Sequence, residues 1–136
     1  MTLAYAFMKM LEQKGYGILG QNLYLYRVPN STKTETEVLW VIPSGGFPSR
    51  VNKTGEMIKT YSMQIYYRSK SAKKVDESLN DLENTLNCLK CIQLEGFEVV
   101  GIRATQLPAD QDADSEDRMR GTISCEIQVY KSCDES

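Results

Sequence analysis

An apolar stripe between residues 71 and 90 constrains the fold of this chain more than any other feature. Its members recur at alternating spacings of three and four residues, the period of one face of an α-helix. The stripe is shorter than three heptads and strand-like segments flank it, so we expect a helix lying on a sheet rather than a coiled coil. The stripe consists of Ala72, Val75, Leu79, Leu82, Leu86 and Leu89.

Two further segments alternate between apolar and polar residues, as strands with one buried face do. In residues 57–68 the alternation places Met63 and Ile65 on one face, together with Tyr61 and Tyr67. In residues 118–131 it predicts a strand whose inward side chains face a core. These inward residues are Ile123, Cys125, Ile127 and Val129.

The apolar run Val38–Ile42 ends at Pro43. A continuous run of this kind suits a strand that is covered on both faces. The next segment, 43–55, contains Gly and Pro at close spacing, and we expect it to be an irregular loop.

The remaining elements are predicted from the spacing of their apolar residues and from residues that typically begin a helix or end a strand. Residues 2–14 have helical spacing of apolar residues, with Thr2 as the N-cap. A strand over 22–28 is expected to stop at Pro29, and another strand is expected over 96–107.

The predicted order is therefore helix, three strands, helix, two strands, without repeats or a linker. The length of 136 residues suits one domain, so we expect a single α+β domain over residues 1–136. Its sheet should be mixed but mostly antiparallel, with both helices on one face.

Composition excludes several functional classes. The chain has no histidine, so the usual Ser–His and Cys–His nucleophile pairs and histidine metal sites cannot form. The net charge of −2 gives no general attraction to nucleic acid or anionic membranes. No apolar run approaches the ~20 residues of a membrane span, and no signal peptide is evident. We expect a protein made and folded in a cytoplasm, with no catalytic residues, cofactor or metal.

The glycines of Gly15–Gly20 match the GxGxxG pattern of dinucleotide-binding loops. That pattern binds a pyrophosphate only where a strand precedes it and a helix follows it. Here the predicted order is reversed, which favours a plain helix-to-strand turn.

Cys88 and Cys91 form a CxxC pair near the predicted C-terminus of a helix. Redox pairs of this type normally lie at a helix N-terminus, where the dipole lowers the pKa of the thiol. The only other cysteines, Cys125 and Cys133, do not complete a zinc-site spacing. Ordinary reduced thiols are expected, and a redox enzyme stays as an alternative.

Taken together, the glycine turn, the apolar strand and the following segments resemble the minor capsid and tail terminator proteins of long-tailed bacteriophages. The shared features are a double-Gly loop with a nearby Pro, a strand containing Gln, Ile and Arg, and a helix that follows it at once. The residues that carry the resemblance are Gly45, Gly46, Pro48, Gln64, Ile65, Arg68 and Ala72.

The resemblance implies a structural protein of the virion that assembles in the host cytoplasm. Its members form a homohexameric ring that caps the tail tube and contacts the head connector, and DNA passes through the lumen without specific binding. A capsid-side head-completion or adaptor protein is the alternative in the same class. A small α+β domain that binds a ligand or nucleic acid is the alternative from another class.

A cluster of acids between residues 108 and 117 could line such a lumen. The cluster lacks the Gly and the Glu that a calcium-binding EF-hand requires at its sixth and twelfth positions. An acidic lining would instead repel the DNA backbone over ~8–10 Å at physiological salt. The lumen candidates are Asp110, Asp112, Asp114, Glu116 and Asp117.

Aromatic residues, the double-Gly loop and an arginine of the resembling strand supply candidates for contacts between subunits or with a partner. Aromatic and arginine side chains are enriched at protein interfaces, and paired glycines allow close approach of backbones. The interface candidates are Tyr24, Tyr26, Trp40, Gly45, Gly46, Phe47, Arg50, Tyr66 and Arg68.

Overall fold

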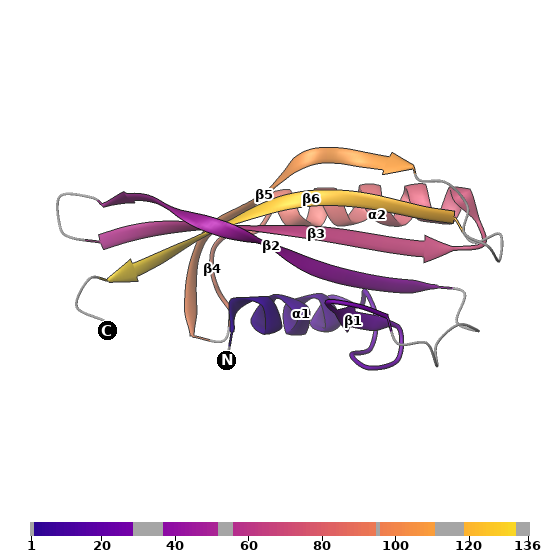
Figure 1. Ribbon diagram of the computed structural model, residues 1–136, viewed down its shortest axis with the longest axis horizontal. Helices are drawn as coiled ribbons and strands as arrows, with labels where there is room; N and C mark the ends of the chain where they lie inside the picture. Colours follow the sequence, from indigo (N-terminus) through magenta and orange to yellow (C-terminus); the bar gives the residue numbers. More distant parts are fainter. Residues whose placement is uncertain (1, 29–36, 52–55, 95, 111–118, 133–136) are drawn as a thin grey trace.

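The computed structural model describes residues 2–28, 37–51, 56–94, 96–110 and 119–132, which form two helices and six strands (Figure 1). In chain order the elements are α1 (Leu3–Gln13), β1 (Leu23–Leu25), β2 (Val38–Val51), β3 (Glu56–Ser69), α2 (Ala72–Asn87), β4 (Lys90–Leu94), β5 (Phe97–Asp110) and β6 (Met119–Ser132).

The strands form one sheet in the order β1-β2-β3-β6-β5-β4. All neighbouring strands are antiparallel except β1 and β2, which are parallel. The last strand, β6, lies between β3 and β5 and pairs with β3 from Met119 to Ser132. The prediction of a mixed, mostly antiparallel sheet in an α+β fold is therefore confirmed.

Both predicted helices are present, and side-chain caps begin them. The hydroxyl of Thr2 accepts a hydrogen bond from the Tyr5 N–H at 3.2 Å, and the hydroxyl of Ser71 accepts one from the Lys74 N–H at 3.2 Å. Such caps satisfy backbone donors that the first helical turn leaves unpaired. The inward stripe of α2 is as predicted, with four buried residues: Val75, Leu79, Leu82 and Leu86.

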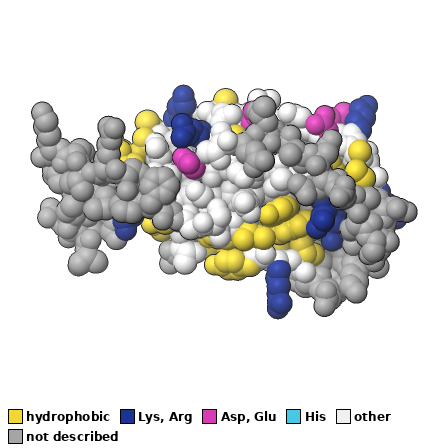
Figure 2. Space-filling view, turned by 45° about the horizontal axis from the view of Figure 1, so that its top comes forward, with side chains coloured by type: hydrophobic (Ala, Val, Ile, Leu, Met, Phe, Trp, Pro, Cys, Tyr) yellow, Lys and Arg dark blue, Asp and Glu magenta, His cyan; other side chains and the backbone are white. Residues whose placement is uncertain are grey.

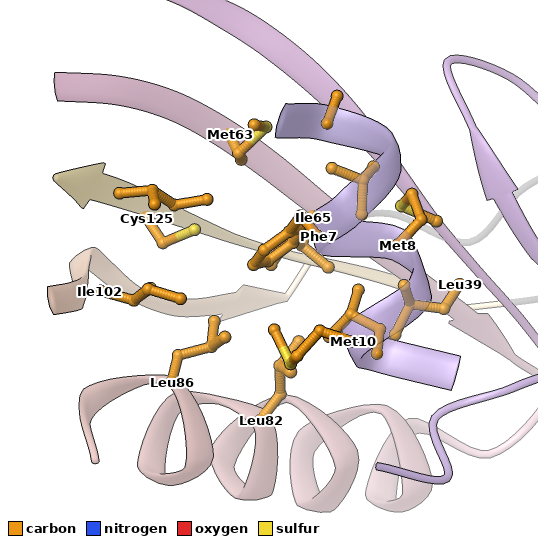
Figure 3. Close-up of a cluster of buried hydrophobic side chains, with 14 of the residues drawn as sticks. Phe7, Met8, Met10, Leu39, Met63, Ile65, Leu82, Leu86, Ile102 and Cys125 are labelled. Atoms are coloured by element: carbon orange, nitrogen blue, oxygen red, sulfur yellow. The ribbon is translucent and has the colours of Figure 1, made fainter. Parts of the chain in front are cut away.

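The core lies between the helices and one face of the sheet. Phe7 of α1 is fully buried and lies beside Ile65 of β3 (Figure 3). Leu82 and Leu86 of α2 point toward the same core, close to Met10 and Ile102, respectively. Both helices thus cover the same face of the sheet. The predicted inward residues of β3 and β6 belong to this face and are buried or partly buried.

The prediction of an irregular loop over 43–55 is wrong for most of its length. β2 continues to Val51 and β3 begins at Glu56. Irregularities in the β2–β3 register between Pro43 and Gly46, and between Pro48 and Arg50, absorb the glycines and prolines. Extra residues of this kind kink a strand without ending it, which hides the period in the sequence. The β2–β3 hairpin and the end of β6 project beyond both helices (Figure 1).

Two other boundaries differ from the sequence prediction. An additional strand, β4, follows α2 at residues 90–94. The helix therefore ends sooner than expected, and three strands instead of two follow it. Within β4, Cys91 has a left-handed backbone (φ +53°), which interrupts the alternation that would have revealed the strand. The strand predicted over 22–28 is shorter and consists only of β1.

Candidate functional site

The face of the sheet opposite the helices is the candidate site. Strand residues alternate between the two faces, so those next to the buried Leu39, Val41, Ile65 and Tyr67 point away from the core. In the part of the chain that the structure describes, both helices lie on the other side. We call this surface the open face. It includes Trp40 and Ile42 of β2, Gln64, Tyr66 and Arg68 of β3, and Arg120, Thr122, Ser124, Glu126 and Gln128 of β6.

The open face corrects one prediction about β2. The run Val38–Ile42 was expected to be covered on both faces, but Trp40 and Ile42 are only partly buried. Leu39 and Val41 are 3% and 0% exposed, so the run is buried on the helix side alone. Two short helices are sufficient to cover only one face of a six-stranded sheet. The chain therefore leaves apolar strand residues partly exposed, and Figure 2 shows hydrophobic side chains gathered in the middle of the molecule beside a Lys or Arg.

An aromatic pair forms the centre of the open face. Trp40 and Tyr66 are directly opposite in the β2–β3 register, and their rings stack with centroids 5.3 Å apart and an interplanar angle of 11°. The guanidinium carbon of Arg68 lies 6.0 Å from the centre of the Trp40 ring. The Tyr66 hydroxyl donates a hydrogen bond to Oε1 of Gln64 at 2.9 Å. These contacts hold both rings in place before any partner binds.

Tyr24 continues this row onto β1, since it pairs with Trp40 in the parallel register. Its side chain is only 9% exposed, and its hydroxyl contacts the carbonyls of Gly20 at 3.0 Å and Gln21 at 2.8 Å. The Tyr24 hydroxyl thus makes its hydrogen bonds within its own chain. The structure brings Tyr24, Trp40, Tyr66 and Arg68 together, although they were selected separately from the sequence.

Tyr26 lies apart from the row and has an unusual backbone. Its side chain is 60% exposed and its φ is +78°, a left-handed conformation that costs free energy for a residue with a side chain. The Tyr26 N–H donates to the Val41 carbonyl at 2.8 Å, which holds its backbone at the edge of the sheet. An exposed aromatic ring on a backbone anchored in this way is suited to a contact with another molecule.

The double-Gly segment lies in the projecting part of β2. Gly45 has φ +93°, a conformation that glycine adopts without strain, and it lies at the first irregularity of the strand. Gly46, Phe47 and Arg50 pair through their backbones with Tyr61, Thr60 and Ile58, respectively. The side chains of residues 46–50 lie outside the described set, so their predicted interface role stays a prediction.

The acidic cluster is mostly outside the described residues. Asp110 ends β5, where it is opposite Gly121 of β6. Asp112, Asp114, Glu116 and Asp117 are not among the described residues. Their predicted place in a lumen therefore stays a prediction.

The glycine turn Gly15–Gly20 is a helix-to-strand connection, because α1 precedes it and β1 follows it. It borders an open cavity of about 460 Å³ whose lining includes Tyr16, Tyr67, Lys74 and Asp81. The Tyr16 hydroxyl is hydrogen-bonded to Asp81 at 2.9 Å and to Thr85 at 2.8 Å. Lys74 is paired with Glu37, which raises the pKa of this lysine. Lys74 is thus paired with Glu37, and Asp81 accepts a hydrogen bond from Tyr16. The order of strand, glycine turn and helix that a pyrophosphate site needs does not occur here.

The cysteines do not form a metal site among the described residues. Cys88 caps the end of α2 and Cys91 lies in β4; both are exposed free thiols. Cys125 faces the core from β6, and burial raises the pKa of its thiol to about 12. The low exposure and high pKa of Cys125 both suppress formation of the reactive thiolate.

We predict that Cys125 stays unmodified by an aromatic disulfide reagent at pH 8, while Cys88 and Cys91 react. The measurement is a thiol titration of a Cys133→Ser variant in the native state and after denaturation. Two thiols should titrate in the native state and the third only after unfolding. Because the folded pKa is raised above the ordinary 9.0, Cys125 should not affect the pH dependence of stability below about pH 9 and should lower stability as the pH rises from 9 to 12. Rapid labelling of Cys125 would contradict its burial.

The sequence pattern alone could not place Arg120 beside Arg68. Each was predicted on a strand, but only the register shows that they are direct cross-strand neighbours on the open face. The register between distant strands has no local sequence pattern.

The model of the bacteriophage tail terminator family matches residues 10–131, which include nearly all of the elements described above. The chain belongs to this family. As a tail terminator it is a structural component of the phage virion. A chain in the virion of a native gene transfer agent particle has a similar fold, with a TM-score of 0.57, 11% identity, and coverage of 82% of this chain and 81% of that chain. No curated protein matches the sequence. No described helix of this tail terminator is long and apolar enough to cross a membrane.

Proposed function

We propose that this tail terminator forms a homohexameric ring that caps the tail tube, stops its growth and joins it to the head connector, with the whole chain as the ring subunit. Membership of the tail terminator family over residues 10–131 carries the proposal. The open face supports it, because Trp40, Ile42 and Tyr66 stay partly exposed in a single chain. Partly exposed aromatic residues with a neighbouring arginine are typical of protein interfaces.

The ring would leave a lumen for DNA, and we place the acidic cluster at that lumen. Lys or Arg in the lining would bind phosphates and slow the passage of DNA. Six copies of Asp110, Asp112, Asp114, Glu116 and Asp117 would instead repel the duplex at short range. A structure of the ring with these acids on its outer rim would end this part of the proposal.

Light scattering combined with size exclusion, with and without the tail tube protein, tests the ring. We expect a species of six times the 15.4 kDa subunit mass, formed alone or on tube ends, and shorter tubes when the protein is added during polymerisation. A protein that stays monomeric and binds no tube would overturn the proposal. Binding to the head connector without any binding to tube ends would favour the capsid-side adaptor instead.

A further inference from the structure

The open face has a hollow above Gly101 of β5, which we call the Gly101 hollow. Its volume is about 270 Å³. The register explains why it forms: Gly101 pairs with Lys90 of β4 on one side and with Gln128 of β6 on the other. A position without a side chain therefore lies between two long side chains on the same face of the sheet. The other lining residues are Val100, Ile102, Arg103 and Glu126.

Packing within the chain does not require a glycine at position 101. Its backbone lacks the positive φ that favours glycine, and a Cβ built there would lie 3.9 Å from the Leu89 carbonyl oxygen and from Cγ of Lys90. These are ordinary van der Waals distances, so alanine would fit. The register irregularity at this point has Val100 as its extra residue, and it does not need the glycine either. A glycine inside a strand weakens it and often marks a site that another molecule approaches closely.

The size and the lining of the Gly101 hollow suit one aromatic side chain. Pockets for small-molecule ligands usually have about 300–1,000 Å³, which is more than this hollow offers. Aromatic rings are known to cover strand glycines from a neighbouring position. The methylene stems of Lys90 and Arg103 supply apolar contacts for a ring, and the amide of Gln128 supplies a hydrogen-bonding group for a phenolic hydroxyl.

Tyr26 is the exposed aromatic residue that matches this hollow. Its side chain is 60% exposed, more than any other large hydrophobic residue in the part of the chain that the structure describes. Its φ of +78° is strained for tyrosine, whereas glycine or asparagine adopts such a conformation more readily. Backbone strain of this kind is concentrated at functional sites. The chain therefore has a tyrosine at a position where its own backbone favours a smaller residue.

Tyr26 does not line the Gly101 hollow of its own chain. It directly follows β1 at one edge of the sheet, whereas the hollow lies among β4, β5 and β6 at the other edge, with β2 and β3 between them (Figure 1). A second copy of the chain brings one Tyr26 for each hollow. Contacts between two different patches of identical subunits produce a ring when the rotation closes.

We propose that Tyr26 of one copy of this chain inserts into the Gly101 hollow of the next copy. This inference rests on the proposed ring and names the side chain and the hollow that join its subunits.

Two variants test the two sides of this contact. Tyr26→Asn removes the aromatic ring, and Gly101→Leu fills the hollow from its own strand. Each variant should need a concentration about thirtyfold or more higher than the wild type to form rings, which is the usual effect of losing an interface hot spot. Light scattering over a concentration series measures the mass of the ring, and circular dichroism checks the fold.

The stability of the monomer distinguishes a contact residue from one that the fold needs. Asparagine tolerates a left-handed backbone better than tyrosine does. Tyr26→Asn should therefore melt at or above the temperature of the wild type when both proteins are diluted to monomers. A lower melting temperature of Tyr26→Asn together with the loss of rings would assign Tyr26 to the fold and overturn the contact.

Matched controls change similar side chains elsewhere. Tyr5→Ala removes an aromatic residue of α1 that is 42% exposed. Thr105→Leu adds a leucine at an exposed position of β5 that does not line the hollow. Both controls should form rings at the wild-type concentration.

Cross-linking tests the position of Tyr26 directly and does not depend on the folding of Gly101→Leu. One preparation carries Tyr26→Cys and the other carries Gln128→Cys, each with Cys88, Cys91 and Cys133 changed to serine. The remaining thiol, Cys125, is buried. A short bismaleimide cross-linker should join two chains in the mixture of the two preparations but not in either preparation alone.

The outcomes separate the inference from the proposed function. A wild type that is monomeric with and without tubes overturns the ring, and this inference with it. Wild-type rings together with normal assembly of Tyr26→Asn and Gly101→Leu, or with no cross-link in the mixture, overturn only the contact. If Gly101→Leu forms rings normally but no longer binds tube ends, the hollow takes a side chain of the tube protein instead of Tyr26.

Discussion

Replacing Phe7 with alanine is expected to lower the free energy of unfolding by about 3–5 kcal/mol. Phe7 is 0% exposed and fills the space between α1 and the inward face of β3 (Figure 3). Its removal loses the transfer free energy of the ring and leaves a cavity that the surrounding helices and strands cannot fully close. Urea denaturation at one fixed chain concentration measures the change, since association also contributes to stability.

Tyr5→Ala is the matched control for Phe7→Ala. Tyr5 lies on the same helix, but its side chain is 42% exposed. Its removal should cost about 1 kcal/mol or less, mainly from a weak contact with Lys9, whose amine lies 5.8 Å from the Tyr5 ring centre. Equal losses for the two variants would contradict the position of α1 on the sheet.

Replacing Trp40 with alanine is expected to shift the protein from rings to monomers. A buried aromatic hot spot at an interface is worth about 2 kcal/mol or more, which weakens each contact about thirtyfold. Within the subunit Trp40 is only partly buried, so the fold should lose mainly the stacking with Tyr66, about 0.5–1.5 kcal/mol. Elution volume on a sizing column measures assembly, and thermal unfolding measures the fold.

Tyr66→Ala removes the other half of the stack and should have the same direction of effect. Tyr5→Ala, on the helix side of the molecule, should elute as the wild type does. If Trp40→Ala and Tyr66→Ala both leave elution unchanged, the open face is not a contact between subunits.

Much of the fold could be predicted because helices and strands have short periods, and the spacing of apolar residues in the sequence shows them. Alternation in β3 and β6 and the stripe of α2 correctly predicted which side chains face the core, such as Ile65, Ile127 and Leu82. Where the backbone departs from the regular period, the prediction failed. Gly45 and Pro48 hid the continuation of β2, and the left-handed Cys91 hid β4.

Individual residues of the candidate site could be predicted from the sequence, but their position next to one another could not. Trp40, Tyr66 and Arg68 were selected for their side-chain type, and the structure shows that they form one stacked cluster. Arg120 was not selected, because a lone arginine at a strand start carries no indication of its partner. Its position became informative only when β6 was found to pair with β3.

The sequence by itself determined the family, the helices and the inward residues of the long strands, because helical and strand periods depend on the nearest neighbours along the chain. Only the tertiary structure decided the strand order, the register and which apolar residues stay uncovered. These are properties of distant segments: β6 meets β3 after an intervening helix and two strands. The exposure of Trp40 depends on where both helices pack, and the position of Arg120 opposite Arg68 depends on the pairing of β6 with β3.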